Sequence, residues 1–246
     1  MSLQFSNTTT KGGMIQVLER NLKLDDGAIS GNATLFKKMT SDINLGLAKV
    51  WALIFASNDT WQWDDTNYED YPIITTDLVD GQRDYAFLTD NSGALVLDIY
   101  KVMVKNHDGV YMEIYPVDVQ SEENTADIYD GRNIEGIPYR YDKTANGIFL
   151  DPIPDENSTN GLKVYINREG SFFTSSDTTK KPGFAALFHE YPVIWASEKN
   201  ANRDSMKSIA GFRSDRLEME AAIKKHYARR QRDVQNVLEA PPINSV

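Results

Sequence analysis

The sequence predicts an α+β protein, in which N- and C-terminal helices form a helical bundle and an antiparallel β-sandwich or barrel-like unit is inserted between them. Apolar residues recur every three or four positions near both ends of the chain, which is typical of amphipathic helices. Between these ends, short runs rich in Val, Ile and Tyr alternate with turn residues, which is typical of a small antiparallel β unit. The predicted parts are an N-terminal arm at 1–12, N-terminal helices at 13–60, the β unit at 61–182, C-terminal helices at 183–238 and a C-terminal tail at 239–246.

The N-terminal helical region is predicted to contain two helices. The first runs from Gly13 to about Leu24, and the Asp-Asp-Gly sequence ending at Gly27 terminates it. The second extends from about Ala33 to Ala56. Its apolar residues form a single stripe: Leu35, Met39, Ile43, Leu47, Val50 and Ile54.

Two hairpins are predicted in the β unit. The first joins residues 73–79 to residues 84–88 across a turn that contains Gly81. The second joins residues 95–105 to residues 110–115 across a turn that contains Asp-Gly. The further strands expected in this part of the chain lie at 137–141, 147–150 and 162–166.

The C-terminal region is predicted to return to helix. A helix from Phe184 to about Asn202 contains Pro192, which should kink the helix or start it. A break is expected at residues 208–211, followed by a charged helix from Arg213 to about Val237. The Pro-containing tail cannot continue that helix.

The composition is that of an ordinary globular protein, with 41% hydrophobic and 25% charged residues among 246. The absence of cysteine excludes disulfides and thiolate chemistry and fits folding in a reducing compartment. No apolar run approaches the roughly 20 residues that cross a bilayer. The N-terminal residues lack the charged-then-apolar pattern of a signal peptide, so secretion and membrane insertion are not expected.

Charge is distributed unevenly along the sequence. The net charge is −10, but residues 199–232 hold ten Lys and Arg against four Asp and Glu, a local charge of +6. The rest of the chain holds 16 basic and 32 acidic residues, a charge of −16. An acidic body disfavours broad binding to nucleic acid. A basic helix on such a body suits contact between copies, or with another acidic surface.

Two sets of residues are candidate subunit or partner interfaces. Phe172 and Phe173 precede a polar loop, where they either close the edge of a sheet or form an exposed docking patch. The second set consists of basic residues that either form a solvated surface or contact another subunit: Lys224, Lys225, Arg229, Arg230 and Arg232.

Motifs for catalysis and cofactor binding are absent from the sequence. His189-Glu190 begins like the zinc-protease HExxH motif, but Val193 occupies the position of the second histidine. No GxSxG elbow surrounds a serine, and neither GxGxxG nor GxxxxGK[ST] occurs. We therefore expect no enzymatic activity, no cofactor and no metal.

The stretch WQWDDTNYEDYP at residues 61–72 combines four aromatic and four acidic residues. Read as a calcium loop from Asp65, it has Asp70 in place of the required glycine and Thr76 in place of the bidentate glutamate. Trp61 and Trp63 beside carboxylates are compatible with a carbohydrate-binding or carbohydrate-active site. The alternative is a joint between the helical and β regions, because the stretch lies where one periodicity ends and the other begins.

The order of several segments resembles the head-to-tail adaptor (connector or head-completion) proteins of tailed bacteriophages. A helix ending in WALIFASNDTWQWDD is followed by PIITTDLVDGQRDYAF, LDIYKVMVKNHDGVYMEIYPVD, GIPYRYDKTANGIFLDPIP and LKVYINRE, and then by a late helical segment. The resemblance covers roughly residues 35 to 200. It rests on the order and spacing of these segments and matches the basic C-terminal helix only loosely.

The resemblance implies a structural virion protein at the head-tail junction, assembled in the bacterial cytoplasm. Its copies would form an oligomeric ring, twelvefold in the family, below the portal protein, and this ring would continue the channel for double-stranded DNA. The helical layer would form the ring wall, and the β unit would contact tail or other ring proteins. The terminal arm or tail would dock on the portal, and both segments would order only on binding a neighbour. The alternatives are the carbohydrate-binding β domain described above and a ring protein further down the tail.

Overall fold

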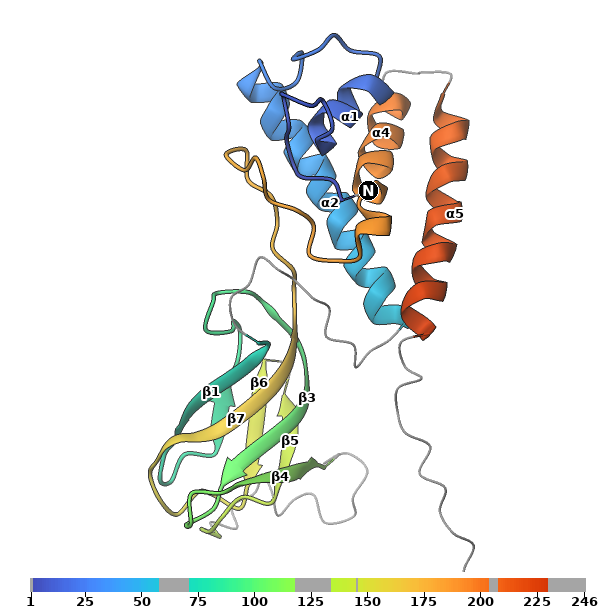
Figure 1. The fold of residues 1–246 in the computed structure, drawn as a ribbon. Helices are drawn as coiled ribbons and strands as arrows, with labels where there is room; N and C mark the ends of the chain where they lie inside the picture. The colour runs from blue at the N-terminus through green and yellow to red at the C-terminus, as the bar shows by residue number, and fades with distance from the viewer. Residues whose placement is uncertain (1, 58–70, 118–133, 145, 204–207, 230–246) are drawn as a thin grey trace, which may run out of the picture. The chain divides into compact units, whose positions relative to one another are not determined.

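The computed structural model describes residues 2–57, 71–117, 134–144, 146–203 and 208–229 and shows an α+β chain (Figure 1). The chain divides into two compact units. The first, here called the helical unit, comprises Met1–Trp63 and Phe172–Val246. The second, here called the β unit, comprises Asp64–Ser171. Both ends of the chain therefore contribute to the same unit, and the middle forms the other.

In the described part of the helical unit, four α-helices and one short 3-10 helix are present. They are α1 (Met14–Asn21), α2 (Ala33–Ser57), η1 (Ala186–Phe188), α4 (Tyr191–Arg203) and α5 (Ile209–Ala228). The predicted long helix is confirmed as α2. Pro192 lies in the first turn of α4, where its missing N–H costs no helical hydrogen bond, so it starts the helix. The expected break at 208–211 is wrong, because α5 already begins at Ile209.

One hydrophobic core joins residues from all four of these helices. Ile15 and Leu18 of α1, Ile43 and Leu47 of α2, and Val193 of α4 are fully buried in it, and Ile223 and Tyr227 add the inner face of α5. Helices α2, α4 and α5 run side by side within the unit (Figure 1). The apolar stripe of α2 is therefore covered by elements from both ends of the chain.

The N-terminal segment belongs to this core and is not an arm that waits for a partner. Phe5 is fully buried, and its ring stacks on that of Phe173 at 4.5 Å between centroids. Its N–H donates to the Lys180 carbonyl at 2.7 Å, and the Ser6 N–H donates to the Thr178 carbonyl at 2.9 Å. The expectation of an arm that orders only on binding a neighbour is wrong for these residues, because apolar burial and backbone hydrogen bonds hold them in place.

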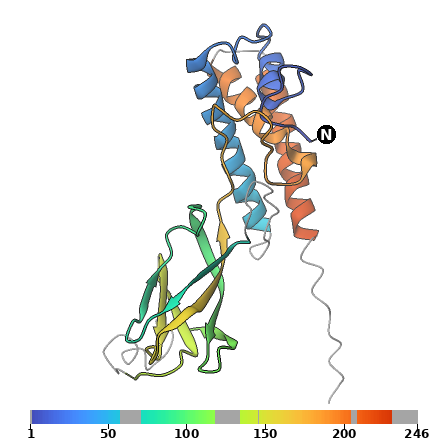
Figure 2. The ribbon, with the colours of Figure 1, turned by 60° about the vertical axis from the view of Figure 1, so that its left-hand side comes forward.

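The β unit contains seven strands among its described residues. They are β1 (Ile73–Leu78), β2 (Asp84–Ala86), β3 (Val96–Lys105), β4 (Tyr111–Pro116), β5 (Arg140–Thr144), β6 (Gly147–Asp151) and β7 (Ser158–Arg168). They form one sheet in the order β1-β7-β3-β4-β5-β6-β2, which curls into a half-barrel (Figure 1). Figure 2 shows this curl from a second direction. Val102, Val104, Leu162 and Val164 are fully buried on its inner side.

The strand pairing confirms one predicted hairpin and contradicts the other. Strands β3 and β4 pair as the expected antiparallel hairpin. Strands β1 and β2 do not pair, because β1 lies against β7 and β2 against β6. The segments meet through a side chain, since the Val79 N–H donates to the Tyr85 hydroxyl at 2.9 Å. A wholly antiparallel unit is also wrong, because β4 and β5 are parallel.

A glycine permits the close approach of α2 and α4, and its replacement tests that contact. A Cβ on Gly46 would lie 2.7 Å from the Pro192 Cα. We expect Gly46→Ala to lower the free energy of unfolding by about 1–3 kcal/mol, because overpacking outweighs the gain in helix propensity. Chemical denaturation measures this change.

The matched control is Gly211→Ala in α5, where a Cβ meets nothing within 4 Å. This substitution should leave stability unchanged or raise it by up to about 1 kcal/mol, since alanine is the better helix former. Equal effects of the two substitutions would contradict the tight contact at Gly46.

Candidate interaction surfaces

The basic residues of the C-terminal helix are exposed where the structure describes them. Lys224, Lys225 and Arg229 lie on the outer side of α5 or directly after it, while Ile223 and Tyr227 of the same turns are buried. Arg230 and Arg232 lie outside the described residues. The described members of the set therefore form an exposed cationic surface.

Two other arginines of α5, the partly buried Arg216 and the more exposed Arg213, join α5 to α4. The Arg213 Nε donates to one Glu198 oxygen at 3.0 Å, and the Arg216 Nε donates to the other at 2.6 Å. Arg216 also pairs with Glu220, which accepts the Tyr191 hydroxyl hydrogen bond at 2.9 Å. The charge count around α5 therefore overstates its cationic surface, because these two guanidinium groups are engaged within the unit.

The electrostatics of this cluster favour an ionised Glu198. Burial raises the pKa of its carboxyl, but the hydrogen bonds and charges of Arg216 and Arg213 lower it by more, so the net pKa is below its ordinary value. Burial raises the pKa of the Tyr191 hydroxyl above its ordinary value, and its hydrogen bond to Glu220 adds to this. The cluster is therefore a structural tie between helices α4 and α5.

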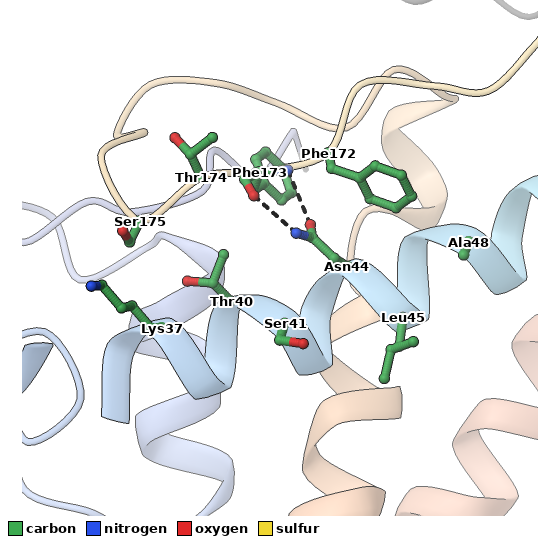
Figure 3. Close-up of a pocket in the computed structure, with 10 residues that line it drawn as sticks. All are labelled: Lys37, Thr40, Ser41, Asn44, Leu45, Ala48, Phe172, Phe173, Thr174 and Ser175. Carbon is green, nitrogen blue, oxygen red and sulfur yellow. Dashed lines mark hydrogen bonds between the residues drawn. The ribbon is translucent and has the colours of Figure 1, made fainter. Parts of the chain in front are cut away.

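The Phe172–Phe173 pair packs on α2 and does not close the edge of a sheet. Phe173 is buried, and its backbone is bonded on both sides by Asn44 (Figure 3). Its N–H donates to the Asn44 Oδ1 at 3.0 Å, and its carbonyl accepts from the Asn44 Nδ2 at 2.9 Å. Phe172 is 38% exposed and lies edge-on to Trp51 at 4.7 Å. Phe173 is thus an anchor, and Phe172 alone remains a candidate docking residue.

A shallow hollow of about 340 Å³ lies beside this pair (Figure 3). Leu45, Ala48 and Phe172 form its apolar part, and the polar residues around it are Lys37, Thr40, Ser41, Asn44, Thr174 and Ser175. Among the residues that the structure describes, no carboxylate or imidazole lines it. The lining offers an apolar contact with hydroxyl groups around it.

The histidines have separate environments. His189 is buried, and its ring nitrogens contact the Leu3 backbone at 3.2 Å and the Phe184 carbonyl at 2.9 Å. Desolvation lowers the pKa of His189 below its ordinary value. The rings of Phe188 and Tyr227 flank His226. Within the described ranges, no group of three His, Cys, Asp or Glu side chains is placed to hold a metal ion.

The exposed face of the sheet carries a set of residues that sequence reasoning missed. Lys101 lies opposite Tyr165 across β3 and β7, and Lys105 lies opposite Tyr111 across β3 and β4. Lys163 lies 4.1 Å from the Tyr111 ring centroid, and Lys105 lies 5.2 Å from the same centroid. We call these five residues the lysine–tyrosine face. The even spacings of Lys101 and Lys105 and of Lys163 and Tyr165 were visible in the sequence, but only the strand register brings the five residues together.

Trp61 and Trp63, on which the carbohydrate-binding alternative rests, lie outside the described residues. Comparisons of the sequence with protein-family models and with curated proteins find no match. Among the helices that the structure describes, none is long and apolar enough to cross a membrane.

Replacement of Glu198 tests the tie between α4 and α5. We expect Glu198→Gln to lower the free energy of unfolding by about 1–3 kcal/mol at neutral pH, because hydrogen bonds to a charged group are lost. Since the folded-state pKa is lowered, this stabilisation is present above the ordinary carboxyl pKa of about 4.3 and is lost as the pH falls through the folded-state value. The difference from the parent chain should therefore shrink in acid.

The control for this substitution is Glu218→Gln, because Glu218 is exposed on α5. Urea denaturation between about pH 3 and pH 7 measures both variants against the parent chain. An equal loss of stability in the two variants, or a pH-independent loss in Glu198→Gln, would contradict the assigned role.

His107 provides a second electrostatic test. Its Nδ1 lies 3.1 Å from Glu156, and its Nε2 lies 3.9 Å from Asp155. The hydrogen bond and charge of Glu156 raise the pKa of His107 above 6.5, with smaller contributions from Asp155 and Asp108. An NMR titration should give a midpoint above 6.5 for this ring. Any stability linked to it is present below the ordinary histidine pKa and is lost as the pH rises through the raised value.

Glu156→Gln should move that midpoint back toward 6.5. The control Asp98→Asn removes a carboxylate that pairs with Lys143 instead, so it should leave the His107 titration in place. An unchanged midpoint in Glu156→Gln would rule out the contact.

Proposed function

We propose that the chain is a non-enzymatic structural protein of a tailed-bacteriophage virion, which forms a ring joining the portal to the tail. The observation that carries the proposal is the order and spacing of the segments that resemble head-to-tail adaptor proteins over roughly residues 35 to 200. The fold class is compatible with it, because a β unit lies between helical segments from both ends of the chain.

The arrangement of charge supports an assembly role. Exposed lysines of α5 provide a cationic surface on a chain of net charge −10, so unlike surfaces of identical copies attract one another. A contact between two different surfaces of the same chain generates a closed ring when its rotation closes. The cluster of Glu198, Arg216 and Glu220 holds α4 and α5 together, which is a structural role.

In the proposed assembly, the helices form a bundle that makes the ring wall, and the β unit contacts tail or other ring proteins. Twelve copies bind below the portal at the head-tail junction, after folding in the bacterial cytoplasm. Double-stranded DNA passes through the channel without sequence-specific binding.

Native mass spectrometry of the full chain, alone and mixed with the matching portal protein, tests the proposal. A ring, or a portal-bound ring with one copy per portal subunit, is the expected result. Rings that do not bind the portal but bind a tail protein would assign the protein to a position further down the tail. A monomer that does not bind the portal would overturn the proposal.

The cationic surface of α5 is tested by Lys224→Glu combined with Lys225→Glu. This double reversal should weaken ring formation or portal binding by about tenfold or more, because it replaces attraction with repulsion. The control combines Lys23→Glu with Lys38→Glu, which changes the net charge equally at exposed positions of the same unit. If the control weakens assembly as much, net charge and not this surface is responsible.

A further inference from the structure

The lysine–tyrosine face lies on the outer side of the sheet. Val102 and Val104 point into the core of the β unit, so Lys101 and Lys105 point the opposite way along β3. Buried Leu162 and Val164 place Lys163 and Tyr165 outward on β7 by the same alternation. Strands β7, β3 and β4 are neighbours in the sheet, so these side chains form one continuous surface (Figure 1).

Contacts within the unit hold the side chains of this face in position. The Lys105 Nζ donates to the Thr159 carbonyl at 2.8 Å, and the Tyr111 hydroxyl donates to the Asn160 carbonyl at 2.5 Å. The Tyr111 ring lies under two lysine ammonium groups, and the Lys101 ammonium lies 5.8 Å from the Tyr165 ring centroid. A surface whose long side chains are already ordered loses less entropy when a partner binds.

The face has more positive than negative charge. Glu113 forms an ion pair with Lys101 at 2.7 Å. Within the described part of the chain, no carboxylate forms an ion pair with Lys163. Its ammonium group lies over the Tyr111 ring. Asp77 of the neighbouring strand β1 is exposed and accepts from the Asn160 N–H at 2.7 Å, so it is a second carboxylate at this face. Three lysines against Glu113 and Asp77 leave a surface with an excess of one positive charge on an aromatic base, which suits a carboxylate-bearing partner.

An acidic complement exists on the same unit. The turns that follow β1, β3 and β6 approach one another, since the Asp80 N–H donates to the Asn157 Oδ1 at 3.1 Å and His107 contacts Asp155 and Glu156. Asp80, Asp108, Asp155 and Glu156 thus project from one group of turns, here called the acidic turns. The turn that carries Asp108 joins Lys105 of β3 to Tyr111 of β4, and Asp155 and Glu156 lie shortly before β7. The acidic turns therefore border one end of the lysine–tyrosine face, and one copy presents both halves of a complementary contact side by side.

A second copy suits this face better than nucleic acid does. Phosphate binding requires several neutralising cations, and here one of three lysines is already paired on a chain of net charge −10. A second copy of this acidic chain presents an excess of carboxylates, and the acidic turns gather four of them, two of which also contact His107. We propose that the lysine–tyrosine face of one copy binds the acidic turns of a second copy. This inference rests on the proposed function, because the contact would join neighbouring copies in the proposed ring.

Charge reversal on each side, followed by mixing, tests this contact in the full-length chain. Lys105→Glu with Lys163→Glu reverses the face, and Asp155→Lys with Glu156→Lys reverses the turns. Each double variant alone should associate about tenfold or more weakly than the parent chain in sedimentation velocity. An equimolar mixture should recover association, because each variant then supplies the charge that the other needs.

Circular dichroism and thermal melting check that the variants fold, and Lys105→Gln with Lys163→Gln gives a neutral version that should weaken association to a smaller extent. Parent-like association of both reversed variants would overturn the inference while leaving the proposed ring intact. Failure of the mixture to recover association would overturn it as well. A parent chain that forms no oligomer, alone or with the portal protein, would overturn the proposed function and this contact together.

A double-stranded DNA oligonucleotide, measured by fluorescence anisotropy, is the second probe. Any DNA binding by the parent chain should be the same in the variant that combines Lys105→Glu with Lys163→Glu. DNA binding that is lost in Lys105→Glu with Lys163→Glu, together with unchanged self-association, would assign the face to a nucleic acid and overturn the inference.

Discussion

The helical unit depends on how the chain is anchored after the β unit, at Phe173. Asn44 of α2 bonds both the N–H and the carbonyl of Phe173, much as a neighbouring strand would. The Phe173 ring then stacks on Phe5, whose own N–H is bonded by the Lys180 carbonyl. Three segments that are far apart in the sequence are thus fixed at one place, and α4 and α5 can complete the core that α1 and α2 leave open. A buried amide satisfied in this way is costly to disturb, because both backbone groups would lose their partners.

Sequence periodicity was sufficient for α2 and insufficient for the segment before α1. The apolar stripe of α2 extends over six positions, so its signal survives any single exception. Leu3 and Phe5 stand alone among polar residues and give no periodic signal, although both are buried. In the β unit, the turn between β3 and β4 revealed their pairing, whereas β1 and β2 have non-local partners that no local turn can indicate. The candidate surfaces differ in the same way. The basic residues of α5 lie close together in the sequence and were predicted, whereas the lysine–tyrosine face is assembled from three strands and was missed.

Charge has two distinct roles in the helical unit, and they cannot be separated by counting residues. Arg213 and Arg216 share a run with Lys224 and Lys225, yet the arginines bond Glu198 while the lysines are exposed. Arg216 bonds Glu198 and Glu220 through two guanidinium nitrogens, which suits a fixed, partly buried tie between helices, and the more exposed Arg213 adds a bond through its Nε. The ammonium of a lysine keeps its hydration at the surface and remains open to a partner. The choice of residue type therefore follows the role of the position within α5.

In the proposed assembly, the two cationic surfaces would act in different ways. Lys224 and Lys225 of α5 are exposed, so their contribution to association would be mainly long-range attraction, which salt screens. The lysines of β3 and β7 are held over tyrosine rings, so a partner meets a surface that is already ordered. In the proposed ring, long-range attraction would speed the encounter between copies, and a fixed contact would set the rotation on which closure depends. Sensitivity to salt should accordingly separate the two surfaces, with α5 the more sensitive.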